Sequence, residues 1–126
     1  MTENLVMKKE LAMVREFHEK FLVPISDKPT FIPEDRSGLR YKMVKEEIEE
    51  YKSGVENKDL ANIAKELTDI LYATYGAILE HGLQDKMEDI FTEVHRSNMS
   101  KEYHPYKVQK GANFSPANLE KILQDK

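Results

Sequence analysis

Two short acidic clusters have the residue types and the spacing that metal or phosphate chemistry requires. The first comprises Glu46, Glu47 and Glu50, and the second comprises Glu66 and Asp69. Residues three apart project from the same side of a helix, and both clusters adjoin apolar positions on the helical wheel. Carboxylates pressed together in a partly dry site must take up protons or bind a cation. Because the donor atoms are all oxygens, the predicted cation is Mg²⁺ or Mn²⁺.

Two consecutive helices must position these acids. The first is predicted from about residue 35 or 37 to Ser53, where Gly54 ends it, and the second from an N-cap at Asp59 to about residue 81. Gly82 then falls where helices often take the left-handed conformation. A short turn joins the two helices, which favours antiparallel packing.

Antiparallel packing would make the two clusters face each other. Glu47 and Glu50 then lie opposite Glu66 and Asp69 across one interhelical gap, while Glu46 lies at the boundary between the polar and apolar faces. Either pair alone is common on solvated helices. The repeated spacing on neighbouring helices is what favours a joint site.

The rest of the chain is also predicted to be helical. Apolar residues recur at helical period over residues 3–22 and 84–98, and a short last helix is expected over 116–123, after an N-cap at Ser115. The loop over residues 23–37 contains three prolines and is long for a compact domain. It is therefore expected to cover a pocket or carry function.

Two features beside the acids have two interpretations each, and a third has one. His18 is either a histidine at the edge of the core or a contact to a base or phosphate. The small residues Ala73, Gly76 and Ala77 leave room for a partner helix or for a ligand. Phe31, in the proline-rich loop, is a candidate to pack over a pocket.

Length and composition narrow the possible classes. A chain of 126 residues with a net charge of −4 suits a single domain and argues against general nucleic-acid binding. The sequence has no cysteine, which excludes disulfides, thiolate metal sites and cysteine nucleophiles. No run of apolar residues reaches membrane-spanning length. We therefore expect a cytoplasmic protein without a membrane partner.

Several known site types fail on the sequence. None of the four histidines has a glutamate three residues before it, which excludes the ferritin-like di-iron pattern. No EF-hand loop, glycine-rich phosphate loop or HExxH motif is present. Arg96, Asn98 and Lys101 gather where the helix over 84–98 ends; they either complement the helix dipole or bind phosphate oxygens.

The acidic motifs resemble a known family signature. EEIEE at Glu46 to Glu50, followed by ELTD at Glu66 to Asp69, is similar to the EExxE…ExxD signature of the all-α nucleoside triphosphate pyrophosphohydrolases, the MazG-like and phosphoribosyl-ATP pyrophosphohydrolase-like superfamily. HRSNMSK and KGANFSP, nearer the C-terminus, resemble further segments of small members. The resemblance covers roughly Leu39 to Leu123.

The resemblance implies a fold and an activity. The fold would be all-α, a four-helix-bundle-like MazG-type fold with a short extra C-terminal helix. The activity would be Mg²⁺-dependent hydrolysis of a nucleoside triphosphate at the α–β linkage, giving the monophosphate and pyrophosphate. Phosphoribosyl-ATP is the alternative substrate, and a non-enzymatic helical protein that binds a metal or a partner is the rival class. A homodimer or homotetramer is expected.

The resemblance also implies roles for the site residues. Glu47, Glu50, Glu66 and Asp69 would be metal ligands. Glu46 and Glu47 would be the catalytic residues, with Glu46 either an extra ligand or the group that orients the attacking water. The residues implied to contact the substrate phosphates are Arg96, Asn98 and Lys101.

Overall fold

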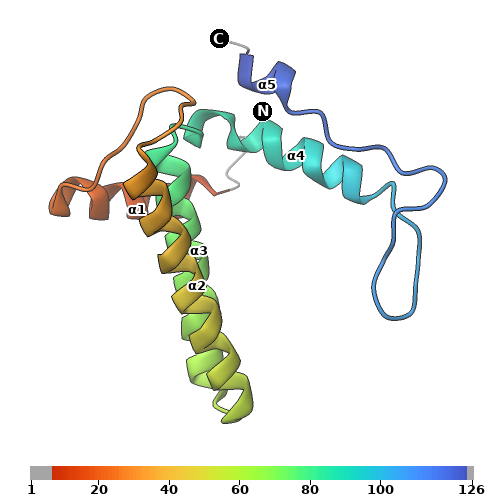
Figure 1. Cartoon of the computed structure of the whole chain (residues 1–126), viewed down its shortest axis with the longest axis horizontal. Coiled ribbons are helices and arrows are strands. Elements are labelled where there is room, and N and C mark those ends of the chain that lie inside the picture. The colour runs from red at the N-terminus through yellow and green to blue at the C-terminus, as the bar shows by residue number, and fades with distance from the viewer. Residues whose placement is uncertain (1–6, 125–126) are drawn as a thin grey trace. The chain divides into compact units, whose positions relative to one another are not determined.

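The computed structural model describes residues 7–124, and this part of the chain is all-α (Figure 1). Its helices are α1 (Lys8–Phe21), α2 (Glu34–Glu56), α3 (Leu60–Glu80), α4 (Met87–Asn98) and α5 (Glu120–Gln124), with a 3₁₀ turn, η1 (Gln84–Lys86), before α4. An isolated bridge between Glu102 and Gln109 is the β-type pairing found in residues 7–124. The predicted all-α fold is thereby confirmed. None of the helices in this range is long and apolar enough to cross a membrane.

The chain forms two compact units. The first contains α1, α2 and α3 and extends to Gln84; the second contains α4, α5 and the connecting tail from Asp85 onward. The expectation of a single domain over residues 1–126 stays a prediction.

The α2–α3 hairpin is the main element of the first unit, and its two helices pack side by side (Figure 1). The predicted end of α2 at Gly54 is wrong, because the helix continues to Glu56. Gly54 is instead buried where α3 comes close: a Cβ there would lie 3.3 Å from Asn62 Nδ2 and 3.4 Å from Ile63. The N-cap predicted at Asp59 is confirmed, since its side chain accepts a hydrogen bond from the Asn62 backbone N–H at 3.1 Å.

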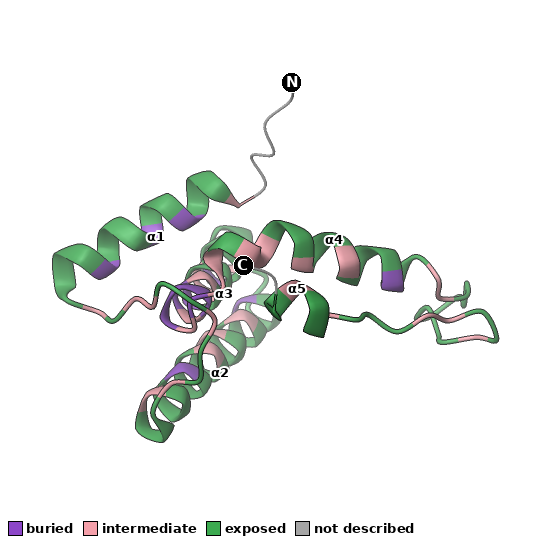
Figure 2. Ribbon diagram, turned by 90° about the horizontal axis from the view of Figure 1, so that it is seen from above, coloured by how far each residue is buried: buried purple, intermediate pink, exposed green. Residues whose placement is uncertain are grey.

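Helix α1 packs one face against α3. Its buried residues are Leu11, Val14 and His18, which share one side of the helix. Figure 2 shows these buried positions as short segments on an otherwise exposed helix. The helix was predicted to begin near residue 3; residues 3–6 lie outside the described part of the chain, and α1 begins at Lys8.

The proline-rich loop docks on the end of α3. The backbone N–H groups of Ser26 and Thr30 donate to the carbonyls of Leu79 and His81 at 3.0 and 2.9 Å. Gly82 has a φ of 69°, as predicted. The expectation that Phe31 packs over a pocket is wrong, because its side chain is 97% exposed. The loop satisfies the carbonyl groups that a helix leaves free at its C-terminus.

The second unit is built on α4 and the tail that follows it. The backbone N–H of Ser115 donates to Ser100 Oγ at 2.8 Å, and its hydroxyl accepts from Arg96 at 3.1 Å. Ser115 therefore anchors the tail to α4 and does not cap a helix. The final helix begins at Glu120, and the predicted start at Pro116 is wrong.

Candidate metal centre and substrate cleft

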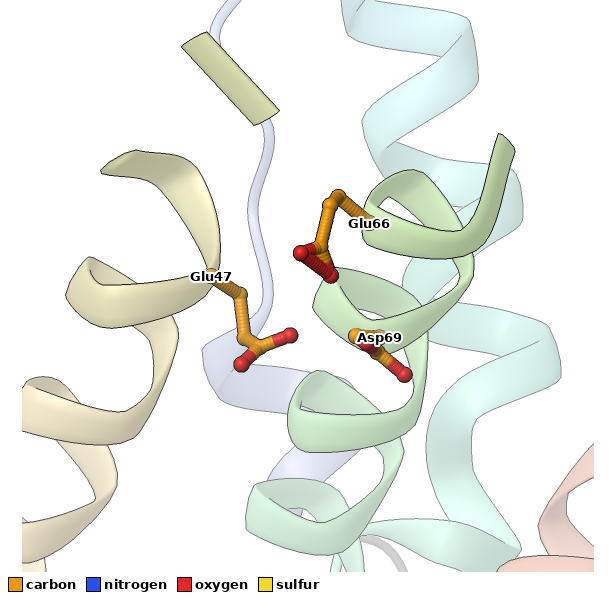
Figure 3. A group of neighbouring side chains, drawn as sticks. All are labelled: Glu47, Glu66 and Asp69. Atoms are coloured by element: carbon orange, nitrogen blue, oxygen red, sulfur yellow. The ribbon is translucent and has the colours of Figure 1, made fainter. Parts of the chain in front are cut away.

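Three carboxylates from α2 and α3 meet in the first unit. One oxygen each of Glu47, Glu66 and Asp69 lies within 4.8 Å of the others. Figure 3 shows Glu47 reaching from α2 toward Glu66 and Asp69 on α3. The arrangement follows from the i, i+3 spacing on α3 and the antiparallel packing of the two helices. These carboxylates are the densest acidic group that the described residues offer to a cation.

The crowding changes the proton affinity of two of these acids. A hydrogen bond with the Glu50 carboxyl, together with burial, raises the pKa of Glu66 to about 7. Burial raises the pKa of Glu47, and a hydrogen bond to Asp69 adds to the effect. Both carboxyls therefore hold a proton more firmly than a solvated glutamate does.

Lys65 partly neutralises the third acid. Its Nζ lies 2.7 Å from Asp69 Oδ2 and 3.5 Å from Glu66 Oε1. The hydrogen bond from Lys65 lowers the pKa of Asp69, which therefore stays ionised and accepts from its neighbours. The lysine side chain itself is exposed. It is free to move away when another cation approaches.

The other two predicted acids lie at the edge of this cluster. Glu50 is exposed and contacts Glu66, but it is not one of the three whose oxygens converge. Glu46 is also exposed and lines the neighbouring cleft together with Glu47. The structure thus brings all five predicted acids to one region. Their roles as ligands or catalysts stay predictions.

The converging carboxylates fit a hard divalent cation. Glu47 Oε2 and Glu66 Oε1 are buried and make no hydrogen bond within residues 7–124, and the nearest cation to Glu66 Oε1 is the Lys65 ammonium at 3.5 Å. Buried acceptors without a donor are costly, and a metal ion satisfies them. The donors are all oxygens from carboxylates, which is the set that Mg²⁺ and Mn²⁺ prefer. Glu47, Glu66 and Asp69 would hold the ion, with Glu50 beside them.

A cleft of about 520 Å³ opens beside the acids, within the first unit. Its acidic end is formed by Glu46, Glu47 and Asp69. Residues from α1, the following loop, α2 and α3 form the rest: Val14, Phe17, His18, Val23, Arg36, Leu39, Arg40, Met43, Tyr72, Ala73 and Gly76. The volume lies in the range of small-molecule sites. Of the small residues, Ala73 and Gly76 line this cleft, which favours the ligand interpretation of that stripe.

Two arginines and one glutamate form a buried network at the other end of the cleft. Glu80 is 2% exposed and accepts from Arg36 Nε at 2.7 Å and Nη2 at 2.9 Å. It also accepts from Arg40 Nε at 2.7 Å. Hydrogen bonds, first from Arg36, lower the pKa of Glu80. The network keeps one net positive charge beside the cleft.

His18 is buried at 3% exposure and also lines the cleft. Its Nδ1 lies 3.1 Å from the Pro24 carbonyl oxygen. Burial lowers the pKa of His18, with a further contribution from the positive charge of Arg40. The neutral ring therefore carries its proton on Nδ1, because the partner there is an acceptor.

The predicted phosphate contacts belong to the second unit. Arg96 donates to both carboxylate oxygens of Glu93 at 2.8 and 2.9 Å, and to Ser115 Oγ and the Pro116 carbonyl at 3.1 Å each. Its guanidinium thus holds the tail against α4. Asn98 is exposed at the end of α4, and Lys101 follows it half-buried. Their contact to phosphates stays a prediction.

The Arg36–Arg40–Glu80 network was missed from the sequence. A usable signal was present, since Glu80 ends a run over residues 70–79 that has no charged residue. A carboxylate on such an apolar helix needs a cationic partner. Arg36 and Arg40 are one turn apart, which places them on one face of α2. The partner helix could therefore have been inferred.

Comparison with known proteins agrees with this site. A family model for phosphoribosyl-ATP pyrophosphohydrolase matches residues 14–98, more than half of the chain. The matched segment contains every acid of the cluster and every residue named above as lining the cleft. A search of curated proteins found no match. The chain belongs to the phosphoribosyl-ATP pyrophosphohydrolase family, within the all-α MazG-like nucleoside triphosphate pyrophosphohydrolase superfamily.

Proposed function

We propose that this protein is a Mg²⁺-dependent pyrophosphohydrolase that cleaves an NTP or dNTP at the α–β linkage, in the upkeep of the nucleotide pool. The observation that carries the proposal is the convergence of Glu47, Glu66 and Asp69 at one end of a cleft whose other end is cationic. Phosphoryl transfer depends on positioning and on charge neutralisation. A site with acids for a metal and an adjoining nucleotide-sized cleft supplies both.

The chain's own residues divide the work. Bound Mg²⁺ would neutralise the phosphate charge and polarise the phosphorus that is attacked. Glu47, Glu50, Glu66 and Asp69 would hold the ion. Glu46, exposed at the cleft, would accept the proton of the attacking water. The water oxygen bonds to phosphorus as the bridging P–O bond of the α–β linkage breaks. The products are the monophosphate and pyrophosphate.

The residues that the family resemblance implies as phosphate contacts all belong to the second unit. Asn98 and Lys101 have no competing side-chain hydrogen bond within residues 7–124, and both are candidates to bind phosphate oxygens. Arg96 is a weaker candidate because Glu93 already engages its guanidinium. This assignment rests on the resemblance of HRSNMSK to family segments.

Phosphoribosyl-ATP is the second candidate substrate, and the family match favours it. It carries a phosphoribosyl group on its adenine and so needs space beyond the base. Buried side chains of His18 and Arg40 line the cleft, and we infer that they limit the space for this additional group. This limit favours a simple nucleoside triphosphate.

A homodimer or homotetramer fits the exposed apolar residues of the hairpin. Ile48, Leu67 and Leu71 are each close to half exposed in the single chain. Exposed large apolar side chains on neighbouring helices are what a subunit interface would cover. A cytoplasmic setting, where nucleotides are found, suits the same function.

The test is a phosphate-release assay with added pyrophosphatase. It covers the common NTPs and dNTPs and phosphoribosyl-ATP, with and without Mg²⁺. Activity on one nucleotide class that needs Mg²⁺ supports the proposal, and turnover of phosphoribosyl-ATP alone selects the second candidate. Metal binding without hydrolysis of any substrate would identify a non-enzymatic binding protein.

Isosteric variants then test the acids. Glu47→Gln and Asp69→Asn should each lower kcat/KM by about a hundredfold or more, because metal-ion stabilisation is worth several kcal/mol. Both should keep the helical content, since they remove repulsion between carboxylates. Glu49→Gln, on the exposed side of α2, is the matched control and should leave kcat/KM unchanged. Full activity in Glu47→Gln or Asp69→Asn refutes the assignment.

A further inference from the structure

We propose that the buried end of the cleft recognises the nucleobase of the substrate and selects bases in which a carbonyl oxygen adjoins a ring N–H. These are uracil, thymine, guanine and hypoxanthine, in preference to the amino bases adenine and cytosine. The inference rests on the proposed nucleotide hydrolysis and names its substrate class.

The spacing along the two helices matches the length of a nucleotide. Arg40 and Glu47 are seven residues apart on α2, and Gly76 and Asp69 are seven apart on α3. Seven residues are two helical turns, or about 10 Å, on one face of a helix. That distance is comparable to the span of a nucleoside 5′-phosphate from its phosphorus to the far edge of its base. With phosphates at the acids, the base reaches Arg40 and Gly76.

Arg40 supplies unused hydrogen-bond donors at this end. The side chain is 8% exposed, and within residues 7–124 its hydrogen bonds use Nε alone, which donates to Glu80. Nη2 is buried without a partner, and Nη1 lies against Gly76. A buried guanidinium with free N–H groups favours an acceptor. A base carbonyl accepts from it, whereas an exocyclic amino group is a donor and faces a cation.

His18 supplies the complementary acceptor. Because its Nδ1 donates to the Pro24 carbonyl, its Nε2 carries a free lone pair. A Cβ added to Gly76 would lie 3.2 Å from this Nε2 and 2.6 Å from Arg40 Nη1. The donor and the acceptor therefore meet over the same glycine. This pair matches a carbonyl oxygen beside a ring N–H.

Two aromatic rings beside the cleft suit a flat base. Phe17 and Tyr72 contact each other edge to face, with centroids 5.6 Å apart, and both line the cleft. Bases stack on aromatic side chains without regard to sequence. Stacking therefore contributes affinity for any base, and hydrogen bonds with Arg40 and His18 discriminate between bases.

Binding of non-hydrolysable nucleotides tests the proposal on the wild-type protein. The ligands are α,β-methylene analogues of dUTP and dCTP and of ITP and ATP, each with Mg²⁺, measured by calorimetry. The members of each pair differ at the carbonyl or amino position and the adjoining ring nitrogen. The carbonyl member should bind at least about tenfold more tightly in both pairs, the low end of hydrogen-bonded base discrimination. Equal affinities, tighter binding of the amino members or no binding would each overturn the proposal.

Hydrolysis of the four parent nucleotides separates this proposal from the proposed function. Equal binding accompanied by hydrolysis overturns base selection alone. Selective binding without hydrolysis overturns the enzymatic function and keeps the recognition site.

Two variants locate the selectivity. Arg40→Met leaves Glu80 with both hydrogen bonds from Arg36, and it should reduce the preference for carbonyl bases to about threefold or less. Gly76→Ala places a methyl group against Arg40 and His18, and should weaken the binding of the carbonyl-base nucleotides by at least about tenfold. Gly38→Ala on α2, where a Cβ meets nothing within 4 Å, is the control and should bind like wild type. If Arg40→Met fails to fold, Gly76→Ala alone tests the proposed base site. Wild-type base selectivity in Gly76→Ala would refute that site.

Discussion

Removal of the buried charge of Glu80 should be one of the most destabilising single changes in the first unit. It is 2% exposed and accepts three hydrogen bonds from two arginines, at 2.7, 2.9 and 2.7 Å. In Glu80→Gln the charge disappears while Arg40 stays buried. Removing one partner of a buried ion pair costs about 3–5 kcal/mol. Because the Arg36 side chain is 27% exposed and can be rehydrated, we expect the lower end, about 3 kcal/mol.

Thermal and urea unfolding measure this loss. For a chain of 126 residues, a loss of about 3 kcal/mol lowers Tm by roughly 10 °C. Glu19→Gln is the matched control, since it breaks an exposed 3.5 Å pair with Arg15 and should have almost no effect. A Glu80→Gln protein that is no less stable than Glu19→Gln would refute the reasoning.

Acidification gives an independent check on the same charge. The arginines lower the pKa of Glu80 in the folded state, below the usual carboxyl value that the unfolded chain retains. The contribution to stability is therefore complete above pH 4.5 and is lost as pH falls through the folded-state pKa. The gap in stability between wild type and Glu80→Gln should narrow below pH 4.5. A constant gap down to pH 2 would mean that the charge is not what stabilises the network.

Two further predictions concern the acidic cluster. The folded-state pKa of Glu66 is about 7 against a usual 4.5, so in the metal-free protein the contribution of this one group to stability is complete below pH 4.5 and is lost as pH rises through 7. Glu66→Gln should remove this pH-dependent loss of stability and have a higher Tm than wild type at pH 8 in EDTA. A lower Tm for the variant would contradict this prediction. Lys65→Met removes the cation that pairs with Asp69 and competes with Mg²⁺ for it. The Kd for Mg²⁺, measured by calorimetry, should fall roughly two- to fivefold in this variant and stay unchanged in the control Lys52→Met. Unchanged or weaker binding in Lys65→Met would contradict it.

The sequence predicted the helices where local signals decide the structure. Apolar periodicity, the Asp59 cap and Gly82 each act within a few residues, and the structure has all three. Gly54 was wrongly predicted to end α2 because glycine commonly follows the last turn of a helix, whereas here it permits close contact with α3. Ser115 was wrongly predicted to cap a helix for the same reason, since its partners lie 15 and 19 residues away, at Ser100 just beyond α4 and at Arg96 in α4.

The candidate site likewise contains residues that local spacing predicts and residues that it does not. Repeated i, i+3 spacing located the acids, because that geometry belongs to each helix separately. The network of Arg36, Arg40 and Glu80 joins residues 40 and 44 positions apart, so it is indicated only by combining the lone acid on an apolar helix with two arginines one turn apart on another helix. The cleft depends on that network and on α1, and it needed a three-dimensional structure.

The polar pairs of the hairpin explain how two helices with a small apolar core keep one alignment. Each step forward along α2 is matched by an equal step backward along α3, in the pairs Arg36 with Glu80, Arg40 with Gly76, Glu47 with Asp69, Glu50 with Glu66, and Gly54 with Asn62. A slip of one turn would separate Glu80 from at least one of its two arginines and bring a larger side chain than Gly76 against Arg40. Buried polar groups can specify alignment in this way even when they add little stability. The same alignment sets the distance between the acids and the Arg40 end, so the features that hold the hairpin in register also set the length of the nucleotide it can accept.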